Sequence, residues 1–128
     1  MCDSIRSDGL LPLTMTTSRP HPAVCLVHLA GELDIATVPL LADYLRTQTA
    51  TEPAELVLDL SAVSLLAAAG VALIVNAKHN NDDIHGRLHL IGVTGNRPVE
   101  RVLDLTGMTR TLSIHNGVAE LLEHLDRS

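Results

Sequence analysis

The chain has 128 residues, a length that suits one domain, and a hydrophobic share of 46% that is sufficient for a buried core. That core must be aliphatic, because the sequence has no Trp, no Phe and a single Tyr, Tyr44. A formal net charge of -6, with Lys and Arg scattered along the chain, argues against binding to nucleic acid or to an anionic membrane surface.

The sequence also lacks the marks of an exported or membrane-spanning protein. No apolar stretch reaches the roughly 18 to 20 residues of a spanning helix, and the N-terminus has no long apolar signal region. Two cysteines, Cys2 and Cys25, are too few for a disulfide-rich secreted scaffold. We therefore expect a cytoplasmic protein.

The N-terminal part of the chain predicts an edge strand, a turn and a buried strand. Residues 10–13 favour the start of an edge strand, although a proline among them limits its pairing. Residues 18–22 contain two prolines and favour a turn. The continuous apolar run over residues 23–29 is typical of a strand buried on both faces, with His28 as its polar exception. We expect the chain to leave this strand at residues 31–34.

A helix, a strand and a second helix are predicted next. Thr37 is a candidate N-cap of a helix that ends near residues 49–53, where a proline and β-branched residues follow. Residues 56–60 predict a second buried strand. Residues 71–77 predict an apolar helix, which must be covered largely by other parts of the protein or by a partner.

The C-terminal third predicts shorter elements of the same two kinds. Residues 87–91 alternate as a third strand, and residues 99–105 predict a short helix that stops at Gly107. A fourth strand is expected over residues 111–114, and Asn116 is the expected cap of a final helix. Strands thus alternate with helices, which is the pattern of an α/β domain with a largely parallel sheet.

Three short motifs, in this order and spacing, resemble the STAS family of anti-sigma-factor antagonists. They are GELDIAT at residues 31–37, DLSAV at residues 59–63 and VERVLDLTG at residues 99–107. The resemblance covers about residues 10–127. It implies the STAS fold, a four- to five-stranded mixed, mostly parallel sheet with about four helices packed on it. We expect one such domain over residues 9–128, after a flexible tail of residues 1–8.

The chain departs from the family at the position that is normally modified. In the family, the third strand leads into D-S-S-G or D-S-T-G, and an anti-sigma kinase phosphorylates the first of the two hydroxyl residues. The matching residues here are Ala67, Ala68, Ala69 and Gly70, so Ala68 occupies the phosphoacceptor position. Alanine has no oxygen to accept a phosphoryl group, which predicts binding that is constitutive or controlled by another input. Alternatively, the three alanines only begin a helix.

The resemblance implies a regulatory protein that binds an anti-sigma factor, a kinase-like protein, and so releases a sigma factor for transcription. The predicted partner-binding residues come from three segments that we expect to meet at one surface: Asp34, Thr37, Ala67, Ala68, Ala69, Gly70 and Thr94. A solvated turn explains Asp34 equally well. We expect no cofactor, no metal and no catalysis, because no nucleophile and base have a recognisable spacing.

Other polar residues suggest alternatives with less support. Ser61 and Ser64 are substitute phosphoacceptors, although Ser61 is explained better as the end of a strand. Pairing of Cys2 with Cys25 would make a redox switch, but a thiol in mid-strand is more simply a buried apolar group. The segment 94–96 is a candidate phosphate cradle with a single glycine.

The sequence leaves one candidate metal site and two further functions to consider. His79, His85 and His89 match no standard zinc spacing, and we expect them at the surface. The fold class also fits a scaffold that binds other STAS proteins or itself. It fits equally a sensor of nucleotides or other small ligands, and these two functions stay open at the level of sequence.

Overall fold

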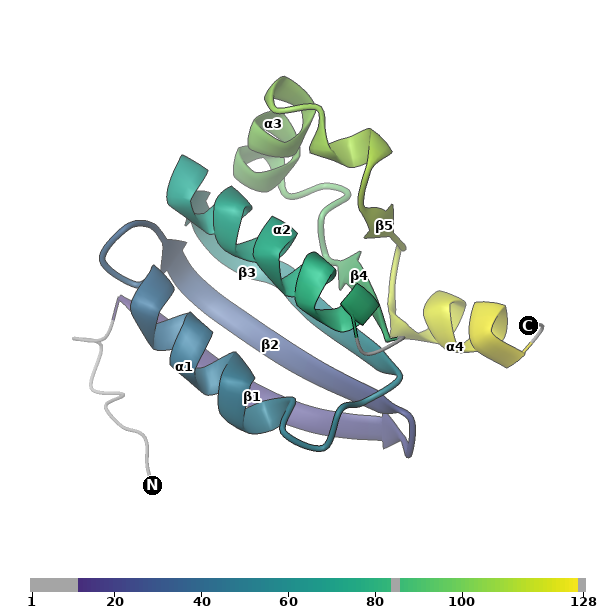
Figure 1. Ribbon diagram of the computed structural model, residues 1–128. Coiled ribbons are helices and arrows are strands. Elements are labelled where there is room, and N and C mark those ends of the chain that lie inside the picture. The colour runs from purple at the N-terminus through teal and green to yellow at the C-terminus, as the bar shows by residue number, and fades with distance from the viewer. Residues whose placement is uncertain (1–11, 84–85, 127–128) are drawn as a thin grey trace.

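The computed structural model describes residues 12–83 and 86–126, and these residues form one five-stranded sheet (Figure 1). Its strands lie side by side in chain order: β1 (Leu13–His21), β2 (Val24–Leu33), β3 (Glu55–Leu66), β4 (Arg87–Ile91) and β5 (Ser113–Ile114). Strand β1 pairs with β2 antiparallel, and each later pair is parallel. The predicted mixed, mostly parallel sheet is therefore confirmed.

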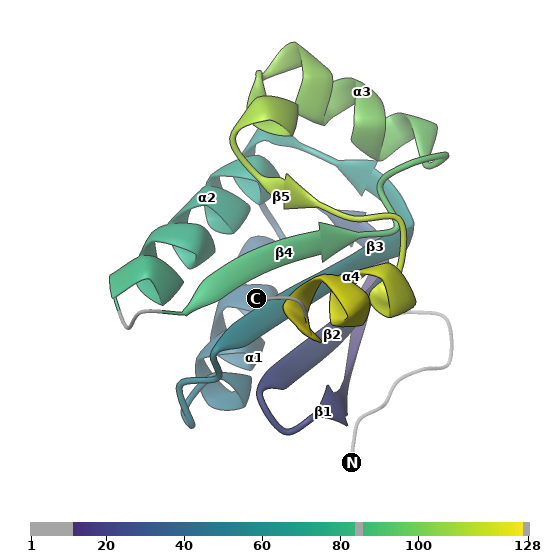
Figure 2. The same cartoon turned by 90° about the vertical axis from the view of Figure 1, so that its right-hand side faces the viewer.

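Four helices of the described residues pack on this sheet: α1 (Val38–Gln48), α2 (Ala68–Asp83), α3 (Arg97–Leu105) and α4 (Val118–Asp126). A short 3-10 helix, η2 (Met108–Arg110), follows α3. Because parallel strands are added in order and their crossovers are right-handed, α1 and α2 lie on the same face of the sheet. Figure 2 shows α4 on the opposite face, where it covers only part of the strands.

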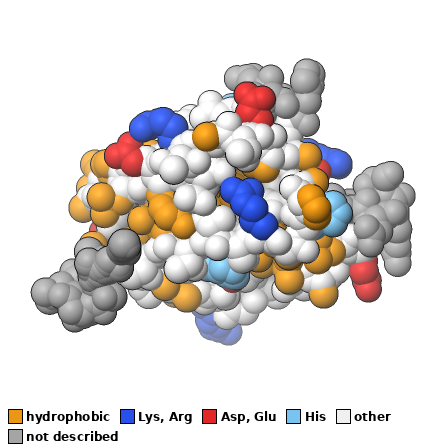
Figure 3. Space-filling view, turned by 90° about the horizontal axis from the view of Figure 1, so that it is seen from below, with side chains coloured by type: hydrophobic (Ala, Val, Ile, Leu, Met, Phe, Trp, Pro, Cys, Tyr) orange, Lys and Arg blue, Asp and Glu red, His pale blue; other side chains and the backbone are white. Residues whose placement is uncertain are grey.

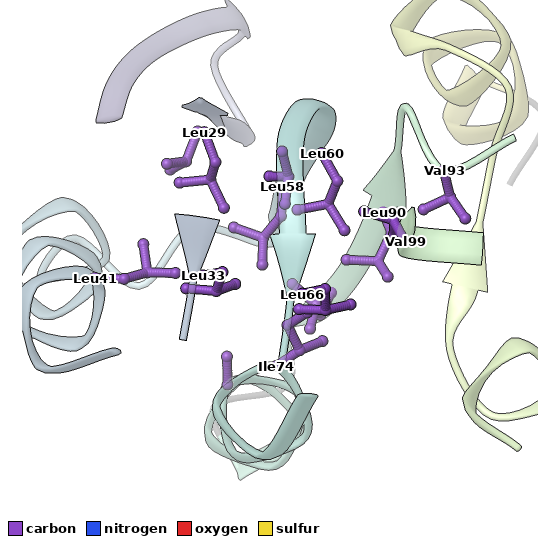
Figure 4. Packing of buried hydrophobic residues seen from close by; sticks show 14 of the residues in the cluster. Leu29, Leu33, Leu41, Leu58, Leu60, Leu66, Ile74, Leu90, Val93 and Val99 are labelled. Atoms are coloured by element: carbon purple, nitrogen blue, oxygen red, sulfur yellow. The ribbon is translucent and has the colours of Figure 1, made fainter. Parts of the chain in front are cut away.

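The main core lies between the sheet and the layer of α1, α2 and α3. It is aliphatic, as the composition predicted, and Figure 4 shows its leucines, isoleucine and valines converging from both sides: Leu29, Leu33, Leu41, Leu58, Leu60, Leu66, Ile74, Leu90, Val93 and Val99. A smaller cluster on the other face forms where Leu121 of α4 packs on Val24, Leu26, Val57 and Ile91. One face of the sheet is thus fully covered and the other only partly.

The N-terminal turn was predicted too early. Strand β1 continues through Pro20 to His21, and the turn consists of Pro22 and Ala23 alone. Proline is tolerated here because β1 is an edge strand, so its missing N–H breaks no bond to a further strand. Ser18, which was placed in the turn, is instead a residue of β1.

The predicted ends of the two central strands were wrong in the same way. Strand β2 runs on through residues 31–33, and β3 runs on past Ser61 to Leu66. These extensions pair with each other, since Glu32 lies opposite Leu65 and Leu33 lies opposite Leu66. A neighbouring strand therefore sustains each extension, which a reading of either segment alone does not reveal.

The later elements agree closely with expectation. Strand β4 has the predicted bounds, and Gly107 follows α3 with a left-handed φ of 75°. Asn116 was expected to cap the last helix, but α4 begins two residues later, at Val118, and the side-chain amide of Asn116 donates to Glu120 Oε2 at 3.1 Å. No helix in the described part of the chain is long and apolar enough to cross a membrane. Figure 3 shows the underside of the molecule, on which hydrophobic atoms are interspersed with polar and charged ones in small groups.

Candidate protein-docking surface

The carboxyl ends of β2 and β3 and the first turn of α2 meet at one edge of the sheet. The backbone N–H of Ala67, just before α2, donates to the carbonyl of Leu33 at the end of β2, at 2.9 Å. The turn from β2 into α1 begins at the next residue, Asp34 (Figure 1). Two of the three predicted segments are therefore brought together, namely residues 34–37 and residues 67–70.

Gly70 permits this close approach. A Cβ built on it would lie 2.8 Å from Leu33 Cγ, 2.8 Å from Leu66 Cδ1 and 3.0 Å from the carbonyl oxygen of Leu33. Any other residue would therefore push α2 away from the ends of β2 and β3. Gly70 itself is buried, so its contribution is to the position of α2.

Asp34 and Thr37 fold the turn that leads into α1. Asp34 Oδ1 accepts the N–H groups of Ala36 at 3.0 Å and of Thr37 at 3.1 Å. The Thr37 hydroxyl donates to the carbonyl of Glu32 at 2.8 Å and accepts from the N–H of Asp34 at 2.9 Å. Thr37 occupies the predicted N-cap, but its side chain is buried and bonds back into the turn, not forward into α1. Both residues shape this surface, and their contact with a partner stays a prediction.

The exposed side chains at this edge are mostly apolar. Ala68, the first residue of α2, is exposed, and Ile35 in the turn before α1 is 82% exposed. Leu40 in α1 and Leu65 in β3 are 47% and 43% exposed. We define the docking surface as these residues and their partly exposed neighbours: Asp34, Ile35, Leu40, Leu65, Ala67, Ala68 and Ala69.

Sequence reasoning missed the three large apolar members of this surface. Ile35 stands within the GELDIAT motif, and neither it nor Leu40 or Leu65 was named as a site residue. The available signal was an isoleucine in a turn, because turns favour polar residues and glycine. Large apolar groups exposed together on a folded protein commonly mark an interaction site.

Thr94, which belongs to the third predicted segment, lies in a hollow near the ends of β3 and β4. This hollow is open, and it is lined by Ser61, Ala62, Val63, Ser64, Gly92, Thr94, Gly95, Asn96, Arg97, Pro98 and Asn116. Asn96 anchors the loop, because its amide nitrogen donates to the carbonyls of Leu60 at 2.8 Å and Val63 at 2.9 Å. The backbone N–H of Asn96, one of those that a phosphate cradle over residues 94–96 would use, donates to the carbonyl of Val93 at 3.0 Å.

Ser64 connects this hollow to the docking surface, since its hydroxyl donates to the carbonyl of Gly31 in β2 at 3.2 Å. Ser61 and Ser64 are both exposed residues of β3. Ser61 was expected to end its strand, but β3 continues to Leu66. Ser61 hydrogen-bonds the Asp59 carboxylate through its backbone N–H and its side chain. The role of either serine as a phosphoacceptor stays a prediction.

The aspartate of the DLS motif organises the neighbouring loop. Asp59 Oδ1 accepts the backbone N–H of Ser61 at 3.0 Å, and Oδ2 pairs with His28 Nδ1 at 2.9 Å. Burial acts to raise the pKa of Asp59, but hydrogen bonds from Ser61 and His28 outweigh it and hold the pKa below its usual value. Gly92 sits against this group with φ 75°, where a Cβ would lie 2.4 Å from the Ser61 nitrogen.

The histidine and cysteine predictions have mixed outcomes. His79 is exposed as expected, but His89 is buried, because β4 is covered on both faces and Glu55 Oε1 accepts from its Nε2 at 2.6 Å. The described residues contain no group of three side chains suited to a metal ion. Cys25 is a free buried thiol whose pKa is raised by burial. His85 and Cys2, and with Cys2 the proposed disulfide and the tail of residues 1–8, lie outside the described residues.

The structure also brings together three polar residues that sequence reasoning did not connect. Ser18 of β1, His28 of β2 and Asp59 of β3 lie on neighbouring strands, and both nitrogens of His28 face a partner. The expectation that no nucleophile and base are recognisably spaced is therefore incomplete. The signal in the sequence was a histidine and an aspartate that each interrupt an apolar strand.

Comparison with known proteins identifies the fold. The profile of the STAS domain family matches residues 16–121. An anti-sigma factor antagonist from Mycobacterium paratuberculosis is 25% identical, with a TM-score of 0.76 over 88% of this chain and 92% of that one. The anti-sigma factor antagonist SpoIIAA from Bacillus is 18% identical, with a TM-score of 0.63 over 89% and 96% of the two chains.

A third solved structure, RsbS from Moorella thermoacetica in a variant form, is 16% identical, with a TM-score of 0.68 over 90% of this chain and 95% of that one. No curated protein shows a significant match to the chain. The last two structures support the fold, and the family match spans most of the sequence.

Proposed function

The chain belongs to the STAS domain family, and from this premise we propose that it binds an anti-sigma factor through the docking surface and so releases a sigma factor for transcription. The protein acts by binding, as a regulatory module. The observation that carries the proposal is that the segments meeting at the start of α2 expose mostly apolar side chains.

The chemistry of the docking surface suits a protein partner. Three large aliphatic side chains, Ile35, Leu40 and Leu65, are exposed in the segments that meet at this edge of the sheet. Their burial against a partner would contribute roughly 25 cal/mol per Å² of apolar area. Two carboxylates lie at this edge. Glu32 is exposed opposite Leu65, and Asp34 has one oxygen occupied by its own turn, which leaves the other for a donor on the partner.

Ala68 also determines how the proposed binding is controlled. A phosphate at this position would bring a charge of about -1.5 to -2 into the middle of an apolar surface and release the partner. Alanine has no hydroxyl, so this route is absent at position 68. We propose that binding is constitutive or responds to an input elsewhere on the chain.

A competition experiment tests the proposal. Each anti-sigma factor of the source organism is purified as a complex with its sigma factor, and the protein is added at increasing concentration. The proposal predicts that sigma factor is displaced from at least one complex, and that prior incubation with an anti-sigma kinase and ATP leaves displacement unchanged. Absence of displacement from every complex would reject the proposed function.

A further inference from the structure

We propose that Ser18 is an activated nucleophile that accepts acyl groups from activated esters, with His28 as its general base and Asp59 as the residue that positions the base. This site lies on the face of the sheet that carries α4, away from the docking surface. It is independent of the proposed regulatory function, so either proposal can fail alone.

The register of the sheet places the three side chains on one face. His28 lies directly opposite Thr16 on β1 and directly opposite Asp59 on β3. Ser18 is two residues from Thr16, and side chains two residues apart in a strand point to the same face. The backbone alone therefore orders serine, histidine and aspartate across three neighbouring strands.

The hydrogen bonds give each group a distinct role. Asp59 Oδ2 is a carboxylate acceptor, so His28 Nδ1, at 2.9 Å, carries the proton of the neutral ring. The lone pair is then on His28 Nε2, which faces the Ser18 hydroxyl at 3.4 Å. A hydroxyl beside a base that a third group orients is the arrangement of an activated nucleophile, and such distances are often long before substrate binds.

The three side chains also differ in solvent exposure, as their proposed roles require. Asp59 is the most buried of the three, with 17% of its side chain exposed, and the Ser61 N–H holds its other oxygen in place. The side chain of His28 is 43% exposed and Ser18 is an exposed residue, so a reagent can reach the hydroxyl. The carboxylate is thus fixed while the nucleophile remains open to solvent.

The reaction follows from these positions. Ser18 Oγ attacks the acyl carbon of an ester, and its proton passes to His28 Nε2. The new Oγ–C bond forms, the bond from carbon to the leaving oxygen breaks, and the leaving group departs as its anion. The substrate class is a small acyl donor whose leaving group is stable as an anion, because the nucleophile and its base are open to solvent.

The test uses p-nitrophenyl acetate with the full chain and quantifies acetylation of each serine by peptide mass spectrometry. Ser64 is the internal control, because it is also exposed but its hydroxyl donates only to a backbone carbonyl. A general base typically accelerates a reaction by about 10² to 10⁴-fold, and the long, exposed contact between Ser18 and His28 favours the lower end of that range. We expect Ser18 to be acetylated at least tenfold faster than Ser64.

Variants separate this chemistry from a purely structural role. His28→Ala should reduce Ser18 acetylation to the rate of Ser64, and added imidazole should restore part of it. Asp59→Asn should slow the reaction, and the conservative change Asp59→Glu should recover it in part. Equal acetylation of Ser18 and Ser64 in the wild-type protein would overturn the proposal, as would an unchanged rate in His28→Ala.

Discussion

Replacing Gly70 with alanine adds one methyl group where the first turn of α2 approaches the ends of β2 and β3. The new Cβ would lie 2.8 Å from carbon atoms of both Leu33 and Leu66, which is closer than real Cβ contacts. Overpacking of this kind costs about 1–3 kcal/mol. Alanine is favoured over glycine in a helix by up to about 1 kcal/mol, which offsets part of that cost.

We therefore expect Gly70→Ala to lower the free energy of unfolding by about 1–2 kcal/mol, or roughly 4–8 °C in Tm for a domain of this size. Urea and thermal unfolding followed by circular dichroism measure both quantities. The matched control is Ala72→Gly at an exposed position of α2, which reports the helix-propensity difference within the same helix. If Gly70→Ala stabilises the protein by the amount that Ala72→Gly destabilises it, the close approach of α2 does not constrain position 70.

Three further substitutions test the polar interactions. Thr37→Val keeps the shape but removes the hydroxyl that serves the turn before α1, and urea unfolding should show a loss of about 1–3 kcal/mol; a neutral result would mean that the turn forms without it. His89→Leu leaves the buried Glu55 carboxylate with one exposed partner, Arg87, and should lower the free energy of unfolding by about 3 kcal/mol. A variant as stable as the wild-type protein would contradict a structural role for the His89–Glu55 pair. The pKa of Asp59 is depressed in the folded state, so the stability that its charge contributes is present at neutral pH and is lost as pH falls through that pKa. The difference in urea midpoint between the wild-type protein and Asp59→Asn should therefore shrink below about pH 4. A difference that stays constant with pH would show that the charge of Asp59 is not responsible.

Local patterns were sufficient for the elements whose limits are set by their own residues. Strand β4 ends where its apolar residues end, and α3 stops at Gly107, which adopts the left-handed conformation that glycine tolerates. The layered α/β order followed from the alternation of strands and helices. These features depend on residues close together in the chain, which is why the sequence predicts them.

Features that depend on neighbours in space were predicted less well. Strands β2 and β3 extend because each supplies hydrogen bonds to the other beyond its apolar run. His89 is buried because Glu55, 34 residues away, supplies a partner for its ring. A histidine in a strand gives no sign of its cross-strand partner until the register of the sheet is known.

The candidate docking surface shows the same division. The resemblance to the STAS family placed residues 34–37 and 67–70 at one site, and the structure brings them together through Ala67 and Leu33. It did not predict the exposure of Ile35, because exposure depends on the tertiary path of the turn. Thr94 was grouped with these segments, but it lies in the hollow at the ends of β3 and β4.

The most direct test of the central claim is the affinity of Ala68→Asp for an anti-sigma factor that the wild-type protein binds, measured by isothermal titration calorimetry. Aspartate in the first turn of α2 is favourable for the helix, so the fold should persist while a buried charge opposes docking. Ala50→Asp, at an exposed turn after α1, carries the same added charge away from the docking surface. The account predicts at least tenfold weaker binding for Ala68→Asp and wild-type binding for Ala50→Asp. Equal affinities of the two variants would contradict it.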